Sequence, residues 1–362
     1  MCLTTNLMKC VIADYDFVCY KQLRQRGNRY LSPYYITNVE LKTVMKTREP
    51  DYDVYKNPNY GNKFSVGEGF IHASIVRDND YFKDENGMVI IKCICRKGTE
   101  YYIDDDAKTI CARELYITDE VINQQDIPLF DRENLMKVFS PIIDNVDTNG
   151  VSVGDYFLSD HTFVHAKNYY GQKKAIGVVG YITDEGEAII TAFKQKCLAW
   201  SDKDEFIDNL KTVNSYEDAY NDMNGRNYTR TVIESKQYSE ENYPAFAYVS
   251  NYNTEGTKKG DWYLSAPGEL NETVAKNMLT INISLVLLND NNVDLIDYGW
   301  YWVSAECRQN AAWLCNTAYA SLYRYYSLKR HSYYVRPSLA FKINENSKES
   351  TLYLSKIYSI NV

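Results

Sequence analysis

The sequence lacks an apolar run long enough to cross a membrane. No window of its 362 residues approaches the roughly 18 consecutive apolar positions that a spanning helix needs. The N-terminal stretch also lacks the unbroken apolar core of a secretory leader, because Asp14 and Asp16 interrupt it. We therefore predict no membrane span and no signal peptide.

The cysteines lack the spacing of a zinc site or of a disulfide framework. Nine cysteines are present, an odd number, and no two of them form a Cys-x-x-Cys pair. A domain of this size also has little need of structural disulfides. We expect free thiols in a chain that folds in a reducing cytoplasm.

Histidines are scarce too, with four in the chain. His161 and His165 are four residues apart, a spacing that could hold a metal on a helix. Their context, SDHTFVHAKN, is typical of a strand and a turn, and His72 lies alone in the apolar strand FIHASIV. We predict no metal site and no cofactor.

Motifs of the common enzyme classes are missing. The chain has no Gly-x-Ser-x-Gly elbow, no His-Glu-x-x-His and no phosphate-binding loop. The neighbouring carboxylates Asp104, Asp105 and Asp106 lie in a charged turn, where solvation is a simpler reading than glycosidase chemistry. We predict that the protein is not an enzyme.

Excess positive charge is absent from the chain as a whole, whose formal net charge is −8. This argues against nucleic acid as a partner. The stretch 299–341 is the exception, because it holds Glu306 as its single acid against five Arg or Lys residues, together with many of the 34 Tyr. Tyr and Arg supply much of the contact energy at binding surfaces. We interpret this stretch as a recognition surface.

The order of the predicted elements indicates an α+β chain with two domains. Residues 1–125 are predicted to be mainly β, as in the β-branched run Met88–Cys95. Residues 126–150 predict a connector with a short helix that Asp131 caps. Residues 151–362 begin with strands, continue with helices and end with strands. All five Trp lie after residue 199, which supports this boundary.

Three helices are predicted in the second domain from their starting signals. Ser201 with Asp204 forms a capping box for a helix over 201–210. Pro244 suits the first turn of a helix that ends near Tyr252. Pro267 begins another helix, PGELNETVAKNMLTINISLVLL, which runs to residue 288.

Several motifs resemble the C-type-lectin-like domains common in gut Bacteroidales and their phages. They are SVGDYFLSD, DMNGRNYTRTVIE, DWYLSAPGELN and a tail that reads YWVSAE, AW and SYYVRPSLAF. The resemblance covers about residues 150–362. It implies a lectin-like domain with two helices around a small twisted antiparallel sheet. The first 125 residues resemble no family that we can name, and we expect them to serve attachment or assembly.

A narrower resemblance is to the variable proteins of diversity-generating retroelements. There a reverse transcriptase copies a template while mutating adenines, so that Asn codons become a restricted set of residues. The resemblance implies a variable region at about 300–336, supported from beneath by Trp302 and Trp313. The implied ligand-binding positions, expected to be exposed, are Cys307, Arg308, Asn310, Ala311, Leu314, Cys315, Tyr319, Ser321, Tyr323, Arg324, Tyr325, Tyr326, Leu328, Arg330 and His331.

This resemblance implies an adhesion protein that binds a cell-surface receptor, either protein or glycan. Its place would be a phage tail or a cell surface, with tail or surface-assembly proteins as further partners and a homo-oligomer as an open alternative. Without a signal peptide, release inside an assembled phage particle is one route out of the cell. The calcium-ligand motifs of animal C-type lectins are absent, so we predict no calcium-dependent sugar site.

Two alternatives stay open. The Tyr-rich stretch also fits a lectin-like adhesin of fixed specificity that binds one glycan or protein. The formylglycine-generating enzymes, which share the lectin-like fold and bind copper through two C-terminal cysteines, invite comparison with Cys307 and Cys315. Seven residues separate these two cysteines, more than in that family, and the surrounding motif is absent.

Overall fold

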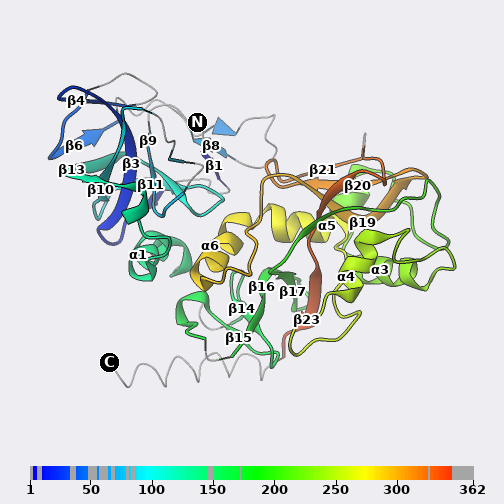
Figure 1. Cartoon of the computed structure of the whole chain (residues 1–362). Coiled ribbons are helices and arrows are strands. Elements are labelled where there is room, and N and C mark those ends of the chain that lie inside the picture. Colours follow the sequence, from blue (N-terminus) through cyan, green and yellow to red (C-terminus); the bar gives the residue numbers. More distant parts are fainter. Residues whose placement is uncertain are drawn as a thin grey trace. The chain divides into compact units, whose positions relative to one another are not determined.

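The computed structural model (Figure 1) describes residues 3–5, 10–32, 38–47, 55–56, 64–66, 70–78, 81–82, 86–144, 150–171, 173–324 and 327–344. The chain folds into two compact units, and the main boundary lies between Val146 and Asp147.

The first unit is built from antiparallel strands. One sheet has the order β1-β8-β7, and a larger one has the order β2-β11-β12-β9-β3-β10-β13-β6, with β4 pairing with β3 and β5. The strand predicted at Met88–Cys95 is present as β10. The strands are β1 (Leu3–Thr5), β2 (Val11–Ile12), β3 (Phe17–Arg26), β4 (Arg29–Leu31), β5 (Asn38–Val39), β6 (Thr43–Lys46), β7 (Tyr55–Lys56), β8 (Phe64–Val66), β9 (Ile71–Ser74), β10 (Met88–Cys95), β11 (Glu100–Ile103), β12 (Thr109–Ala112) and β13 (Glu114–Ile122).

Helix α1 packs on the strands of the first unit. It spans Arg132–Ile143 and follows a short 3-10 turn, η2, at Gln124–Asp126. Its N-terminus is capped as predicted, because the Asp131 carboxylate accepts a hydrogen bond from the backbone N–H of Asn134 at 3.0 Å. The Asn134 side chain accepts from the backbone N–H of Val18 at 2.7 Å and donates to its carbonyl at 2.9 Å, which ties α1 to β3.

The second unit contains two five-stranded sheets, with the orders β15-β14-β16-β17-β23 and β18-β22-β19-β20-β21. Their pairings are antiparallel except that of β19 with β22, which is parallel. The strands are β14 (Tyr156–Leu158), β15 (Phe163–Val164), β16 (Ala175–Ile182), β17 (Glu187–Ala192), β18 (Lys196–Ala199), β19 (Trp300–Arg308), β20 (Ala311–Asn316), β21 (Ser321–Tyr323), β22 (Ser332–Val335) and β23 (Ser338–Lys342).

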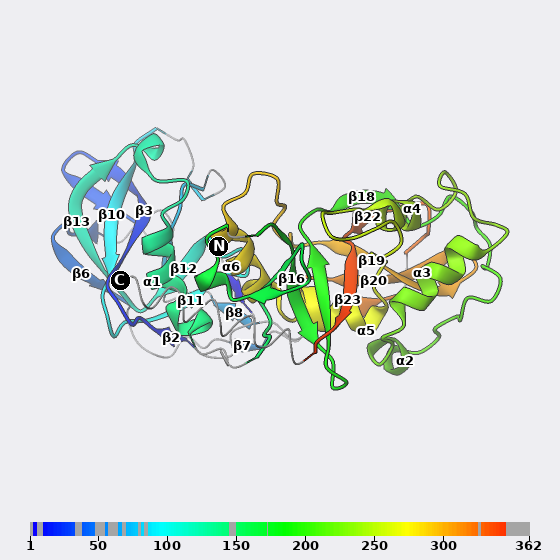
Figure 2. The same cartoon turned by 90° about the horizontal axis from the view of Figure 1, so that it is seen from below.

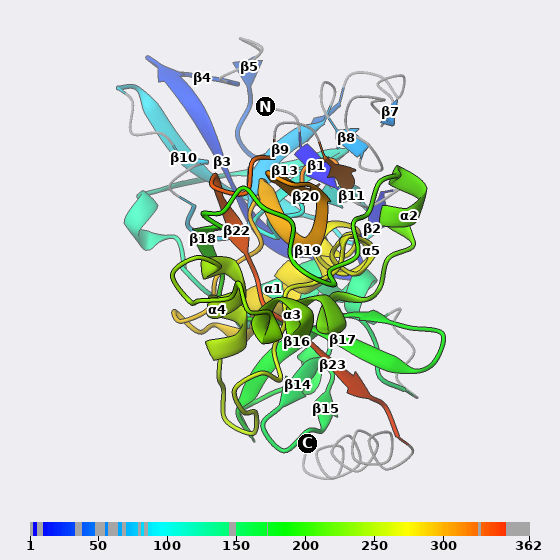
Figure 3. The same ribbon diagram turned by 90° about the vertical axis from the view of Figure 1, so that its right-hand side faces the viewer.

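Helices cover both sheets of the second unit. Helix α3 contacts β19, α4 contacts β18, and α6 contacts β16. Figures 2 and 3 show α3 and α4 side by side along the sheet that contains β19. The helical segments are η3 (Ala166–Asn168), α2 (Tyr216–Tyr220), α3 (Gly225–Glu234), α4 (Pro244–Asn251), α5 (Pro267–Leu270), the π-helical turn η4 (Asn271–Ala275) and α6 (Met278–Leu288).

Large aromatic side chains form the core of this unit. Trp262 is fully buried with Phe157 and Ile190 against the first sheet. Trp302 and Trp313 are buried in the second sheet. Each large ring removes much apolar surface from water, so these positions dominate the energetics of the core. The Trp residues gather in this unit because they build its interior.

One of the three helix predictions for this unit is wrong, and a second is right in part. The stretch 201–210 is an irregular loop, because the backbone N–H groups of Ile207 and Asp208 donate to side chains of distant segments. The helix expected over 267–288 is interrupted after η4, where the Asn277 amide donates to the carbonyls of Glu272 at 2.8 Å and Gly180 at 3.0 Å. The helix predicted from Pro244 is present as α4.

The architecture mixes helices with several antiparallel sheets, which is compatible with the expected α+β class. The second unit is larger than two helices around one small sheet, since it has two sheets and a series of helical segments. Within the residues that the structure describes, no helix is both long and apolar enough to cross a membrane.

Candidate recognition surface

The candidate positions lie on β19, β20, β21 and the segment that leads to β22. Tyr325 and Tyr326 lie outside the described residues. The accessible candidates, which we call the Tyr/Arg surface, are the exposed Arg308, Asn310, Arg330 and His331 and the half-buried Tyr319, Ser321, Tyr323, Arg324 and Leu328.

Four other candidates are buried, so the prediction that they are exposed is wrong. Cys307, Ala311, Leu314 and Cys315 have exposed fractions of 7%, 5%, 3% and 0%. Cys307 lies on β19 and the other three lie on β20, and both are interior strands of the sheet β18-β22-β19-β20-β21. A central strand with both faces covered buries consecutive residues, whatever their polarity. These four positions belong to the core beneath the Tyr/Arg surface.

The strand register separates the two C-terminal cysteines. Cys315 pairs with Tyr301, whereas Cys307 lies at the other end of the hairpin, next to the pair of Glu306 with Ala312. Three positions along β20 separate residue 312 from Cys315, which corresponds to roughly 10 Å. The Cys307 thiol contacts the carbonyl of Arg324 at 3.6 Å, and burial raises its pKa to about 11. This geometry does not bring the two thiols together to share a copper ion.

Tryptophans fix the sheet beneath the Tyr/Arg surface. The indole N–H of Trp302 donates to the carbonyl of Leu198 at 3.0 Å, and that of Trp313 donates to the carbonyl of Val213 at 2.9 Å. A buried indole needs such a partner, so each bond holds its ring in one orientation. The second bond also fastens the end of the loop 201–213 to β20.

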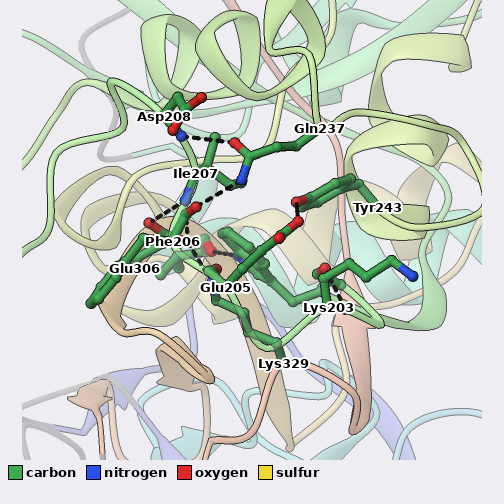
Figure 4. Close-up of polar contacts among 12 residues, drawn as sticks. Lys203, Glu205, Phe206, Ile207, Asp208, Gln237, Tyr243, Glu306 and Lys329 are labelled. Atoms are coloured by element: carbon green, nitrogen blue, oxygen red, sulfur yellow. Dashed lines mark hydrogen bonds and ion pairs between the residues drawn. The ribbon is translucent and has the colours of Figure 1, made fainter.

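A buried ion pair anchors the rest of this loop, as Figure 4 shows. The Lys329 ammonium group donates to the Glu306 carboxylate and, at 2.7 Å, to the carbonyl of Glu205. The Glu306 oxygens each accept from the backbone N–H of Ile207 at 3.3 Å. The side chains of both charged residues have an exposed fraction of 0%. The loop therefore takes its shape from the pair rather than from a helix.

Further side chains complete this network. The Gln237 amide donates to the carbonyl of Phe206 at 2.9 Å and accepts from the backbone N–H of Asp208 at 2.9 Å (Figure 4). The Tyr243 hydroxyl donates to the Glu205 carboxylate at 3.2 Å. Residues 205–208 are thus held from α4 and from the segment after α3, which leaves them no freedom to coil into a helix.

Burial moves both charges of the pair toward neutrality. Desolvation raises the pKa of the Glu306 carboxyl and lowers that of the Lys329 ammonium group, and each partner opposes the shift in the other. The Lys329 ammonium group also lies 4.6 Å from the centre of the Trp200 ring. The attraction between the two charges, together with these contacts, offsets the free-energy cost of removing both groups from water.

Burial also removes two cations from the predicted basic surface. Lys329 is paired inside the unit, and Arg336 has an exposed fraction of 1%. The Arg336 guanidinium donates to the carbonyls of Ala192 at 2.8 Å and Asp294 at 2.9 Å, so it fastens the segment before β23 to the first sheet. The cations left for a partner are Arg308, Arg324 and Arg330.

Arg324 lies over aromatic rings at the edge of the Tyr/Arg surface. Its guanidinium carbon is 5.4 Å from the centre of the Tyr216 ring and 5.9 Å from that of Trp313. It also donates to the carbonyl of Asn214. These contacts fix a cation beside apolar surface, an arrangement that reduces the entropy lost when a partner binds.

Sequence reasoning missed the contribution of the loop before α3. Phe206, Tyr216, Tyr220 and Met223 have exposed fractions of 49%, 37%, 36% and 38%. Tyr216 stacks edge-on against Trp313 with ring centres 5.1 Å apart, and the Tyr220 hydroxyl accepts from the backbone N–H of Leu322 at 3.2 Å. The exposed aromatic residues were visible in the sequence, but their proximity to β20 and β21 is a tertiary feature.

Comparisons with known proteins found a similar structure but no similar sequence. No family model and no curated protein matches the chain. Among solved structures, the chain is similar to a fimbrial protein from Bacteroides ovatus, with 11% sequence identity and a TM-score of 0.43. The match covers 90% of this chain and 64% of that one, so the chain spans less than two thirds of the fimbrial protein.

Proposed function

We propose that the chain is a receptor-binding protein that adheres through the Tyr/Arg surface. We further propose that its second unit is a C-type-lectin-like domain and that the surface is diversified by adenine-directed mutagenesis, as in the variable proteins of diversity-generating retroelements. The protein acts by binding alone, without catalysis and without a cofactor.

One observation carries this proposal: accessible and fixed side chains alternate within one short stretch. Trp302, Glu306, Trp313 and Arg336 are buried and hydrogen-bonded to distant backbone. The residues between them include the Tyr/Arg surface. A protein whose surface residues vary can stay folded only if the buried residues that support them stay constant. The separation of accessible from buried positions in this stretch meets that requirement. These four fixed residues all belong to the motifs of the lectin-like resemblance.

The binding mechanism follows from the accessible side chains. Tyr rings bury apolar area at low cost in conformational entropy, and the guanidinium groups of Arg308, Arg324 and Arg330 contact anionic groups of the partner. A specific interface needs roughly 800 Å² on each partner. The Tyr/Arg surface therefore works together with the exposed aromatic residues of the neighbouring loop, and several subunits strengthen weak single contacts by multivalency.

The partner and location follow from the same proposal. The partner is a cell-surface receptor, protein or glycan, and the chain is displayed on a phage tail or a cell surface. The first unit provides attachment to tail or surface-assembly proteins. These assignments rest on the resemblance of the second unit and on the chemistry of its surface.

A fixed-specificity adhesin is the second candidate, and one observation favours it. Cys307, Ala311, Leu314 and Cys315 lie at positions that the retroelement resemblance would vary, yet they are buried. Random replacement at these sites would disturb the core beneath the surface. A binding surface that stays constant would avoid this cost.

Sequencing of the locus in sister isolates separates the two candidates. Diversification predicts a near-copy of the 300–341 coding region close by, with adenines where the gene differs, beside a reverse-transcriptase gene. It also predicts that isolates differ at Tyr323 and Arg324 while Trp302 and Trp313 stay constant. Absence of a template together with identical 307–331 regions would establish the fixed adhesin, and binding to glycan arrays would then identify its ligand.

A further inference from the structure

Trp300 differs from the other four tryptophans in both burial and hydrogen bonding. The other four have exposed fractions of 0% or 1%, and the indole N–H of each donates to a protein oxygen; they are Trp200, Trp262, Trp302 and Trp313. Trp300 is half-buried at the start of β19, and its indole N–H makes no hydrogen bond to a residue that the structure describes. This N–H is therefore available to a partner molecule.

Trp300 belongs to a set of aromatic rings on one face of the second sheet. Trp302 pairs with Leu314, and Leu314 pairs with Tyr323, so all three share a face with Trp300, two residues before Trp302. The rings of Trp300 and Tyr323 meet edge-on with centres 4.7 Å apart, and those of Trp302 and Tyr333 are 5.0 Å apart. We call the three half-buried residues Trp300, Tyr323 and Tyr333 the aromatic face.

Positive charge accompanies the aromatic face. Lys196 in β18 is exposed and pairs with Val335, two residues after Tyr333, so it lies on the same face. The stretch 299–341 exposes no acid, because its single acid, Glu306, is buried. Asp204, 3.6 Å from one guanidinium group, offsets part of the charge. The accessible cations of the Tyr/Arg surface are Arg308, Arg324 and Arg330. An anionic partner complements this distribution of charge.

The residue types of this region favour a protein as the partner. Trp, Tyr and Arg are the side chains most enriched where a few residues dominate binding at protein interfaces. The indole and guanidinium groups are donors, so carboxylates are their natural acceptors. The formal net charge of −8 for the whole chain argues against nucleic acid. A protein segment that carries apolar side chains beside Asp or Glu meets both conditions.

We propose that the aromatic face and the cations around it form a docking site for an acidic protein segment. An apolar or aromatic side chain of the segment packs on Trp300 and Tyr333, and a carboxylate accepts from the Trp300 indole N–H. Further carboxylates contact Lys196 and the guanidinium groups of the Tyr/Arg surface. The inference rests on the proposed receptor binding, names the class of its partner, and adds three residues to the binding site.

The added aromatic residues give the site a constant part. Trp300 and Tyr333 lie outside the predicted binding positions, which run from residue 307 to 331, whereas Tyr323 is one of them. Tyr333 pairs with Leu198, and the Leu198 carbonyl accepts from the Trp302 indole N–H at 3.0 Å, which fixes β18 to β19. A surface fixed before its partner arrives loses less entropy on binding. Replacement of Tyr323 would then change specificity while the contacts to Trp300 and Tyr333 remain.

Binding of the full chain to a random copolymer of glutamate and tyrosine tests the proposal. Fluorescence anisotropy of the labelled copolymer measures affinity, and we expect binding that weakens as salt is added. Trp-selective fluorescence should change on binding, and Trp300→Phe should remove that change. We expect affinity at least about fivefold weaker in each of Trp300→Ala, Tyr333→Ala and Lys196→Glu. The matched control is Tyr170→Ala, which removes a ring that is 68% exposed outside the aromatic face and should bind as wild type does.

Comparison polymers separate the parts of the proposal. Polyglutamate, which has no rings, should bind more weakly than the copolymer, and a copolymer of lysine and tyrosine should not bind. Heparin and single-stranded DNA carry negative charge without a polypeptide. Equal or tighter binding of either one would overturn the assignment to protein, and absence of copolymer binding at low salt would overturn the proposal as a whole.

The variants distinguish failure of this inference from failure of the proposed function. If Arg308→Ala and Arg324→Ala weaken binding but Trp300→Ala and Tyr333→Ala do not, the Tyr/Arg surface binds without the aromatic face and the inference is wrong. If none of the four weakens binding, the proposed function is wrong as well. Thermal unfolding identifies any loss that comes from misfolding, and in that case Lys196→Glu decides, because Lys196 is exposed.

Discussion

The Lys329 ammonium group donates to the Glu306 carboxylate inside the second unit, and neither side chain is exposed. The pair joins the end of β19 to the segment before β22 and holds the backbone of Ile207 between them. The pair therefore ties three segments that are distant in sequence into one fixed structure.

Removing one partner of this pair should destabilise the second unit. Lys329→Met leaves the Glu306 carboxylate buried without its cation, and we expect a loss of about 3–5 kcal/mol in the free energy of unfolding. Urea denaturation measures the change. Arg330→Met is the matched control, because Arg330 is exposed and only 3.6 Å from Asp204 in a solvated ion pair; we expect a change within about 1 kcal/mol. Equal losses in the two variants would contradict this account.

Buried and exposed candidates should differ sharply in their tolerance of substitution. Cys315→Arg places a charge at a fully buried position of β20, so we expect a loss of at least about 3 kcal/mol or failure to fold. Asn310→Arg changes an exposed residue at the end of the β19–β20 hairpin, and we expect a change within about 0.5 kcal/mol. Chemical denaturation compares the two. Equal tolerance would mean that the core position is not constrained.

Glu269 should give the second unit a pH-dependent stability. Burial raises the pKa of its carboxyl from 4.5 to about 8. The folded state therefore binds a proton that the unfolded state loses, so the stabilisation is fully present below pH 4.5 and is lost as the pH rises to about 8. The slope between these values is up to about −1.4 kcal/mol per pH unit.

Glu269→Gln tests this slope, because glutamine has no proton to lose and its carbonyl can still accept from Ala266 N–H. Denaturation of wild type and variant from pH 4.5 to 8.5 isolates the contribution of Glu269. Asp155, whose pKa burial raises to about 7, contributes equally to both proteins and cancels in the difference. Parallel stability curves for the two proteins would show that Glu269 titrates normally.

Gly268→Ala should disturb the contact between α5 and the loop that follows α2. The added Cβ would lie 2.6 Å from the carbonyl oxygen of Tyr220, which is backbone and has little room to move. We expect a loss of about 1–3 kcal/mol, measured by thermal and urea unfolding. Gly150→Ala is the control, since nothing lies within 4 Å of a Cβ atom at that position. A stable Gly268→Ala variant would show that the loop and α5 can separate without cost.

Local signals in the sequence were sufficient to predict some of the helices and strands. The run Met88–Cys95, the cap at Asp131 and the helix start at Pro244 depend on neighbouring residues alone, and the structure contains all three. The capping signal at Ser201 wrongly predicted a helix, because such a signal reflects only the preference of the isolated segment. Glu306, about a hundred residues away, binds the backbone of that segment instead.

The sequence by itself determined that residues 299–341 concentrate Tyr, Trp and Arg in an acidic chain, and that Trp302 and Trp313 would be structural. Only the tertiary structure decided which residues between them are accessible. Burial depends on the strands that flank a strand and on the helices that cover it, so alternation along β20 does not predict that Leu314 and Cys315 are both enclosed. The same reason explains why Lys329 and Arg336, which read as surface charges, are interior residues: their partners are distant in sequence and come together only when the chain folds.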